Sequence, residues 1–368
     1  MNGADAMDAI TISGISKRYG EVTALHEISF SVGRGELVTL LGPSGCGKTT
    51  TLRAIAGLEK PDSGRIAIHG RDVFSAGERI FVPPEKRALG MVFQSYAIWP
   101  HMTVFENVAF PLRVSRARKY SAAEIKQRVS RMLDMVQLGG YAGRAATQLS
   151  GGQQQRLAFA RGLVHEPAIL LLDEPLSNLD AKLREQMRLE LKRLQRTLNI
   201  TTVYVTHDQS EALALSDEIA VFDSGRVIQR GTPQEIYREP QSRFVADFVG
   251  SANFLPGIAR ATEGGVTVVE TAHGAMRCHF AVPIAAGAKA LLTARPEDIT
   301  LSAGAPPDGM NVLKGKIANR VFLGEVVDYI VDLGDGELRA RLRADDFQIG
   351  QAVTIAVPPQ KCVGLADS

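Results

Sequence analysis

The sequence predicts an α/β domain followed by a small all-β domain. A glycine-rich loop stands between a strand-like run and a helix-like run near the N-terminus. Buried strand patterns then alternate with helical patterns as far as about residue 240. From Asn253 onward, short strand patterns are separated by Gly and Pro. We therefore expect one domain at residues 1–240 and a second at residues 241–368.

Composition narrows the class of protein. The 368 residues are enough for two or three domains with cores of their own. The net charge of +2 implies no polyanionic partner, so we expect no nucleic acid. No apolar run approaches the ~20 residues of a membrane-spanning helix, and the N-terminus lacks a signal layout. Cysteines 46, 278 and 362 have no paired spacing, which favours a reducing compartment over disulfides or zinc. We expect a cytoplasmic protein.

Residues 10–41 predict short antiparallel strands that lead into the apolar run 37–41. The following loop, within LLGPSGCGKTT (Leu40–Thr50), fits the pattern G-x-x-x-x-G-K-[ST] between a strand and a helix. Its glycines allow backbone N–H groups to turn inward, and the helix start adds positive charge, so the loop can wrap phosphates. The alternative is a plain glycine-rich turn. The predicted nucleotide contacts of the loop are Gly42, Pro43, Ser44, Gly45, Cys46, Gly47, Lys48, Thr49 and Thr50.

A helical insert is expected at about residues 95–160. Before it, residues 58–73 predict a turn and one strand, and the strand 88–93 leads to Gln94. Inside it, Ser121 and Glu124 form a plausible capping box before a stripe of apolar residues at helical spacing. Trp99 and Phe105 belong either to the core of this insert or to a groove that accepts a short helix of another subunit.

Two carboxylates and a histidine follow the next strands. A Gly-Gly turn opens a helix within residues 148–161, and the buried strand 169–172 ends in Asp173 and Glu174. The carboxyl edge of an α/β sheet is where ligands bind. After a long amphipathic helix at 181–198, the strand 201–205 ends just before His207. A hairpin at 218–230, a short helix at 242–249 and an all-β sandwich or barrel complete the prediction.

The order of these motifs resembles the ATP-binding subunit of an ATP-binding-cassette (ABC) transporter. The resemblance covers residues 10 to about 240, and LSGGQ before LLLDEP is its most specific part. The motifs, in order, are Gly42–Thr49, Gln94, Leu149–Gln153, Asp173–Glu174, Ser177–Asp180 and His207. The C-terminal part, with ARPEDI, resembles the oligonucleotide-binding-like (TOBE) domain of importer ATPases for maltose, polyamines and ferric iron. The resemblance implies a P-loop NTPase fold of the ABC type with an antiparallel β subdomain.

The family assigns ATP and Mg²⁺ to these residues. Lys48 and the loop amides would hold the γ-phosphate, and Glu174 would act as general base. His207 would contact the γ-phosphate or the attacking water, and Tyr19 would stack on adenine. The residues expected to hold or touch the metal are Thr49, Gln94 and Asp173, and the catalytic set is Glu174, His207, Lys48 and Gln94. Simpler alternatives are a charge-balancing Glu174, a structural His207 and a half-buried strand tyrosine at position 19.

The LSGGQ segment starts a second helix, whose N-terminus could also bind phosphate. If the helical insert holds this helix apart from Lys48, one ATP phosphate chain cannot contact both within the same chain. The resemblance implies that a partner protomer supplies this second helix, in a homodimer that encloses ATP. The residues expected to contact ATP across that dimer are Ser150, Gly151, Gly152, Gln153 and Asp180. A further hypothesis concerns Cys46, whose position near a helix start can lower a thiol pKa: alkylation would block the ATPase, and ATP would protect. Cys278 and Cys362 are expected in the core of the β domain.

The expected function is ATP hydrolysis that powers solute import, for ferric iron or polyamine-type ions. The expected partners are membrane permease subunits and, indirectly, an extracytoplasmic solute-binding protein, which places the chain peripherally on the cytoplasmic face of the inner membrane. The alternative is a soluble ABC ATPase of DNA repair or translation, although such proteins tend to insert coiled coils that this sequence lacks. A nucleotide-gated module without turnover is a third class, and Glu174 and His207 argue against it.

Overall fold

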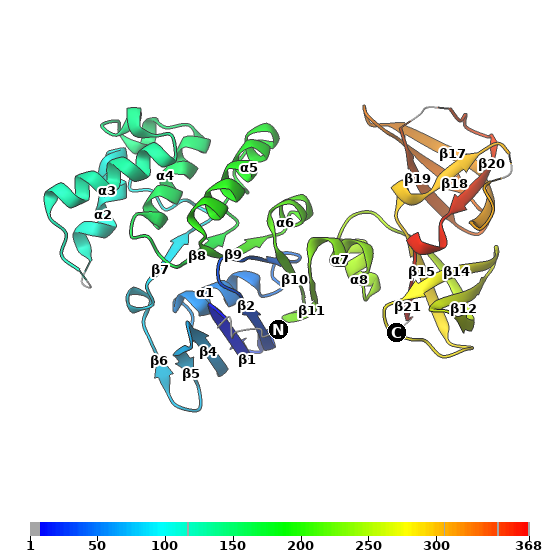
Figure 1. Ribbon diagram of the computed structural model, residues 1–368, viewed down its shortest axis with the longest axis horizontal. Helices are drawn as coiled ribbons and strands as arrows, with labels where there is room; N and C mark the ends of the chain where they lie inside the picture. Colours follow the sequence, from blue (N-terminus) through cyan, green and yellow to red (C-terminus); the bar gives the residue numbers. More distant parts are fainter. Residues whose placement is uncertain (1–7, 116–117, 305, 344–345, 367–368) are drawn as a thin grey trace, which may run out of the picture. The chain divides into compact units, whose positions relative to one another are not determined.

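The computed structural model describes residues 8–115, 118–304, 306–343 and 346–366. The chain divides into two compact units after Pro233 (Figure 1). The boundary expected at residue 240 lies inside the second unit, because the carbonyl of Tyr237 in α7 (Pro233–Arg238) accepts two hydrogen bonds from the Arg295 guanidinium, at 2.8 and 3.2 Å. No helix in the described ranges has the length and apolarity to cross a membrane.

The first sheet of the first unit is antiparallel, with the strand order β2-β1-β4-β5-β6. Its strands are β1 (Ile10–Tyr19), β2 (Val22–Val32), β4 (Ser63–Ile68), β5 (Arg71–Ser75) and β6 (Ile80–Phe81). The prediction of antiparallel strands within residues 10–32 is confirmed. The prediction of one strand between residues 58 and 73 is wrong, because His69 and Gly70 take positive φ angles of 48° and 74° and turn the chain into a hairpin.

The second sheet has the order β11-β10-β3-β9-β8-β7 and is parallel except for β11. Its strands are β3 (Leu37–Leu41), β7 (Leu89–Val92), β8 (Ile169–Asp173), β9 (Thr201–Thr206), β10 (Glu218–Asp223) and β11 (Arg226–Gly231). All residues of β3, β8 and β9 are buried, as expected of a parallel sheet covered on both faces. Because the strands run parallel, the segments that follow β3, β7, β8 and β9 all emerge at one edge.

Helices cover this sheet and form the insert. The helices of the first unit are α1 (Lys48–Ala56), α2 (Val104–Val114), α3 (Ala122–Met135), α4 (Gly151–Leu163), α5 (Ala181–Leu198) and α6 (Gln209–Leu215), with short 3₁₀ turns at Pro84–Lys86, Gly139–Tyr141 and Ala146–Gln148. In Figure 1, α2 and α3 lie beside α4. The capping box of Ser121 and Glu124 is present at the start of α3. Phe105 packs against the apolar cluster of the insert, while Trp99 is half-buried with its ring centre 4.4 Å from that of Phe110.

The second unit begins with α7 and α8 (Arg243–Phe248) and continues as strands. Five strands close a barrel in the order β12-β13-β14-β21-β15, and five more form a sheet in the order β16-β20-β17-β18-β19. The bounds are β12 (Asn253–Glu263), β13 (Val266–Thr271), β14 (Gly274–Phe280), β15 (Lys289–Ala294), β16 (Thr300–Ser302), β17 (Asn311–Phe322), β18 (Val327–Asp332), β19 (Glu337–Leu342), β20 (Ala352–Val357) and β21 (Cys362–Ala366), with 3₁₀ turns at Pro296–Asp298 and Pro359–Lys361. The predicted all-β domain is confirmed.

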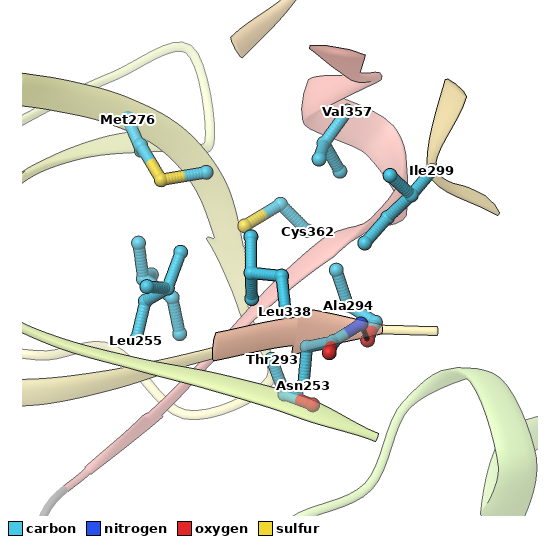
Figure 2. A pocket seen from close by; sticks show the side chains of 10 residues that line it. Asn253, Leu255, Met276, Thr293, Ala294, Ile299, Leu338, Val357 and Cys362 are labelled. Carbon is cyan, nitrogen blue, oxygen red and sulfur yellow. Dashed lines mark hydrogen bonds between the residues drawn. The ribbon is translucent and has the colours of Figure 1, made fainter. Parts of the chain in front are cut away.

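The strands of the second unit share one apolar core. Cys278 and Cys362 are fully buried in it, as predicted, and burial raises the pKa of each thiol to about 12. Figure 2 shows Cys362 near Met276, Leu338 and Ile299 around an apolar cavity of about 10 Å³.

Candidate active site

Glycines shape the phosphate loop at positions where a side chain would clash or strain the backbone. At Gly42 an added Cβ would stand 2.3 Å from the Phe222 carbonyl oxygen, and Gly45 and Gly47 have φ angles of 81° and 104°. The helix α1 that follows has no side-chain cap, so amide groups of its first turn remain for a ligand. The loop therefore presents N–H groups and a helix start to one ligand, which is the arrangement that binds phosphate.

Lys48 lies inside this loop with only 4% of its surface exposed. Its Nζ donates to the carbonyl oxygens of Gly42 and Pro43, each at 2.7 Å. Within the described ranges no carboxylate forms an ion pair with it. A buried lysine that is held only by neutral acceptors has no counter-charge of its own, so the site favours an anion beside it.

Thr49 and Asp173 bring two hard oxygen donors together. The Thr49 Oγ1 donates to Asp173 Oδ1 at 3.0 Å. Burial raises the pKa of Asp173, while the Thr49 hydroxyl and Arg53 act in the opposite direction. No cluster of three or more His, Cys, Asp or Glu that could hold a metal occurs among the residues described. A hydroxyl and one carboxylate fit Mg²⁺, which takes its remaining ligands from water and phosphate oxygens.

Glu174 is the point where three strand ends meet. Its Oε2 accepts from Gln94 Nε2 at 3.2 Å and lies 3.2 Å from His207 Nδ1. These residues follow β7, β8 and β9, which are adjacent in the sheet. Glu174 itself has φ 43°, and its N–H donates to the Val205 carbonyl. The structure thus brings together the three residues that the sequence placed at separate strand ends.

Tyr19 lies at the end of β1 and remains 48% exposed. Lys17 Nζ is 5.2 Å from the centre of its ring, and its hydroxyl lies close to Glu59 and Thr50. Partial burial and the hydrogen bond to Glu59 raise the pKa of Tyr19. The ring therefore stands beside the first turn of α1 with much of its surface available for stacking.

The LSGGQ segment does not complete this site within one chain. Ser150 precedes α4, its N–H donates to Gln153 Oε1 at 2.9 Å, and Ser150 and Gly151 are exposed. Gly152 is buried, and an added Cβ there would stand 2.9 Å from the Leu183 side chain. Asp180 is exposed and caps α5 by accepting from the Leu183 N–H. Among the residues described, no hydrogen bond joins this group to the phosphate loop.

The thiol pKa of Cys46 is shifted in the direction opposite to the one expected. Only 4% of Cys46 is exposed, against Phe222 and the loop, and burial raises the pKa of the thiol although Lys48 opposes the shift. The expectation of a lowered pKa is therefore wrong. Because less thiolate is present at neutral pH, we expect a maleimide to label Cys46 slowly, with a rate that rises with pH beyond the usual thiol range. Mass spectrometry of labelled peptides checks this, and fast labelling at neutral pH would contradict it.

Sequence reasoning missed the residues that hold the His207 segment. Arg184 of α5 donates to the Leu179 carbonyl at 2.9 Å and lies 3.5 Å from Asp208 and 3.9 Å from Glu211. Glu211 is buried and accepts from the hydroxyls of Tyr204 and Thr206, at 2.6 and 2.7 Å. A polar cavity of about 30 Å³, which is large enough for water, is lined by Glu174, Ser177, Arg184, Thr206, His207, Asp208 and Glu211. Asp208 caps α6, which is the one part that the sequence pattern could have indicated.

Arg184 therefore connects the Ser177–Asp180 segment with His207, and we expect Arg184→Ala to lower kcat. Misplacement of His207 and Glu174 by about 1 Å would reduce kcat about 10- to 100-fold with little change in KM. Steady-state ATPase assays measure both constants. Arg188→Ala is the matched control, because Arg188 lies one turn further along α5 and pairs with Glu185. Equal losses in the two variants would contradict a positioning role.

Comparison with known proteins decides the family. The sequence profile of the ABC transporter family matches residues 25–177, and that of the TOBE domain matches residues 292–365. The chain is 47% identical to the spermidine/putrescine import ATP-binding protein PotA 2 of Pseudomonas aeruginosa, over 94% of this chain and 96% of that protein. The chain belongs to the ABC transporter family. The Fe(3+) ions import ATP-binding protein FbpC of Brucella abortus is 45% identical, over 97% of this chain and 95% of FbpC.

Solved ABC structures agree with the first unit. The cbiO1 protein of Clostridium perfringens, part of an ABC transporter complex, superposes with a TM-score of 0.57 at 30% identity, over 63% of this chain and 91% of cbiO1. A dimeric ATP-binding cassette bound to ADP and phosphate superposes with a TM-score of 0.53 at 33% identity, over 61% of this chain and 98% of that cassette. The predicted ABC-type P-loop fold is confirmed, and the chain is an ABC ATPase.

Proposed function

We propose that this ABC ATPase powers the import of a polyamine such as spermidine or putrescine. The carrying observation is the 47% identity to PotA 2, which extends over nearly the whole of both chains. Ferric iron is the second candidate, since FbpC is 45% identical over a similar length. The soluble ATPase of DNA repair or translation loses support, because these relatives are named as import subunits and match the β domain as well.

The site residues divide the reaction between them. Lys48 and the loop amides bind the β- and γ-phosphates, and Tyr19 stacks on the adenine. Thr49, Asp173 and Gln94 would hold Mg²⁺, which when bound neutralises charge on the phosphate oxygens. Glu174 orients a water molecule in line with the γ-phosphate and accepts its proton. Gln94 and His207, each 3.2 Å from Glu174 Oε2, fix the direction of that carboxylate.

The ATPase acts as a homodimer in this proposal. Ser150 and Gly151 are exposed at the start of the 13-residue helix α4, and no phosphate-binding group of the same chain bonds to them. Two copies placed head to tail bring each LSGGQ segment to the other's phosphate loop, so the γ-phosphate bridges the protomers. The dimer works on the cytoplasmic face of the inner membrane with permease subunits, and an extracytoplasmic binding protein delivers the solute.

Uptake assays test the solute. In cells without this chain, uptake of radiolabelled spermidine and putrescine should fall to background while ferric iron uptake is unchanged. The wild-type chain should restore polyamine uptake, and Glu174→Gln should not. Loss of iron uptake with normal polyamine uptake would overturn the polyamine assignment in favour of ferric iron.

A further inference from the structure

The second unit contains a cavity of about 560 Å³ that takes no part in the ATPase site. Its walls come from the end of α7, from β14 and β15, and from the 3₁₀ turn Pro359–Lys361 before β21. All of its lining residues belong to this unit. The volume lies within the range of small-molecule sites, which is about 300–1,000 Å³.

Two exposed polar side chains border this cavity and leave their hydrogen-bonding groups free for a ligand. The side chains of Arg238 and Gln360 make no hydrogen bond or ion pair with any residue that the structure describes. They come from α7 and from the turn before β21.

The charges around the larger cavity favour an anion with one negative charge. Lys361 pairs with Asp298 at 3.0 Å, and Glu239 also has an interaction of its own. Arg295 is buried and donates hydrogen bonds to carbonyl oxygens, while the nearby Glu297 and Asp298 carboxylates act on its charge without a direct ion pair among the described residues. Three Arg and Lys side chains against two Asp and Glu side chains give the lining a formal net charge of +1.

The remaining walls suit an apolar body. Tyr237 and Phe280 contribute aromatic rings, and Pro240 and Val363 contribute aliphatic surface. The Phe280 ring lies against Gly364, where an added Cβ would stand 2.2 Å from the ring, so any other residue at 364 would displace it. We propose that this cavity binds a small organic carboxylate, with its carboxylate on the Arg238 guanidinium and its apolar body against the two rings.

Calorimetric titration of the full chain tests this proposal. The chain is first saturated with ADP and Mg²⁺, so that the phosphate loop is filled, and is then titrated with 3-phenylpropionate. The neutral amide of the same compound and inorganic phosphate are titrated in parallel. We expect saturable binding of the carboxylate. The amide should bind at least about tenfold more weakly, because it loses a charge-assisted hydrogen bond of ~1.5–3 kcal/mol. Inorganic phosphate should also bind at least about tenfold more weakly, because its charge does not match that of the lining.

Two variants locate the binding. Arg238→Gln should weaken the carboxylate at least about tenfold, while Arg260→Gln, an exposed arginine of β12 outside the cavity, should leave it unchanged. No saturable binding, equal binding of the amide, or unchanged binding by Arg238→Gln would overturn the proposal.

Discussion

Replacing Glu174 with glutamine is expected to lower ATP turnover about 10²- to 10⁴-fold, the contribution of a positioned general base. The amide has the same shape but cannot accept the proton of the attacking water. Its contacts with Gln94 and His207, both at 3.2 Å, can be replaced by the amide oxygen. ATP binding should therefore persist. Phosphate release measured at saturating ATP gives kcat, and nucleotide titration gives the dissociation constant.

Glu185→Gln provides the control for Glu174→Gln. Glu185 lies on α5 and pairs with Arg188 within the same helix, outside the site. Its substitution should leave kcat within about twofold of the wild type, as is usual for a surface change. If Glu174→Gln retains turnover within that same margin, Glu174 only balances the charge of the site and another group activates the water.

Lys48→Ala is expected to weaken ATP binding at least about a hundredfold, because a charge-assisted hydrogen bond contributes ~1.5–3 kcal/mol and Lys48 can donate more than one. Turnover should fall with it. The fold should survive, since Lys48 bonds to two loop carbonyls and to no carboxylate in the described chain. The measurement is the melting temperature with and without ATP. ATP that binds the folded wild-type chain raises its melting temperature, and this rise should be lost in Lys48→Ala.

The matched change is Lys60→Ala, which removes a lysine side chain of the same unit that lies outside the loop and contacts the Phe81 ring; the Lys60 carbonyl, which accepts from Lys17 Nζ, is kept. This variant should keep the full rise in melting temperature with ATP. A normal rise in Lys48→Ala would contradict the assignment of Lys48 to the phosphates.

Much of the site could be predicted because its residues lie in short local motifs at strand ends. Lys48 and Thr49 follow β3, Glu174 follows β8, and parallel pairing alone brings those ends to one edge. Arg184 could not be predicted, because it is one of several arginines on an amphipathic helix and its role depends on how α5 packs beside α6. The burial of Cys46 likewise depends on an apolar cluster whose members, such as Phe222, are distant in sequence.

The fold was predictable where periodicity was strong and less so elsewhere. Helix α5 was expected at residues 181–198 and is found there, because its apolar stripe and the Asp180 cap mark it clearly. Strands β12 and β17 are marked less clearly in the sequence. They contain Pro256, Gly257 and Gly315, which weaken a strand signal, and their pairing with distant strands is what stabilises them.

The central claim is that each protomer supplies only part of the site around ATP. Light scattering with size-exclusion chromatography tests it on Glu174→Gln, which should bind ATP without consuming it. With ATP and Mg²⁺ the mass should be that of a dimer, with ADP that of a monomer, and a second change, Ser150→Arg, should keep the ATP-bound chain monomeric. A Glu174→Gln chain that stays monomeric while saturated with ATP, together with a wild-type rate per chain that does not depend on protein concentration, would contradict the account.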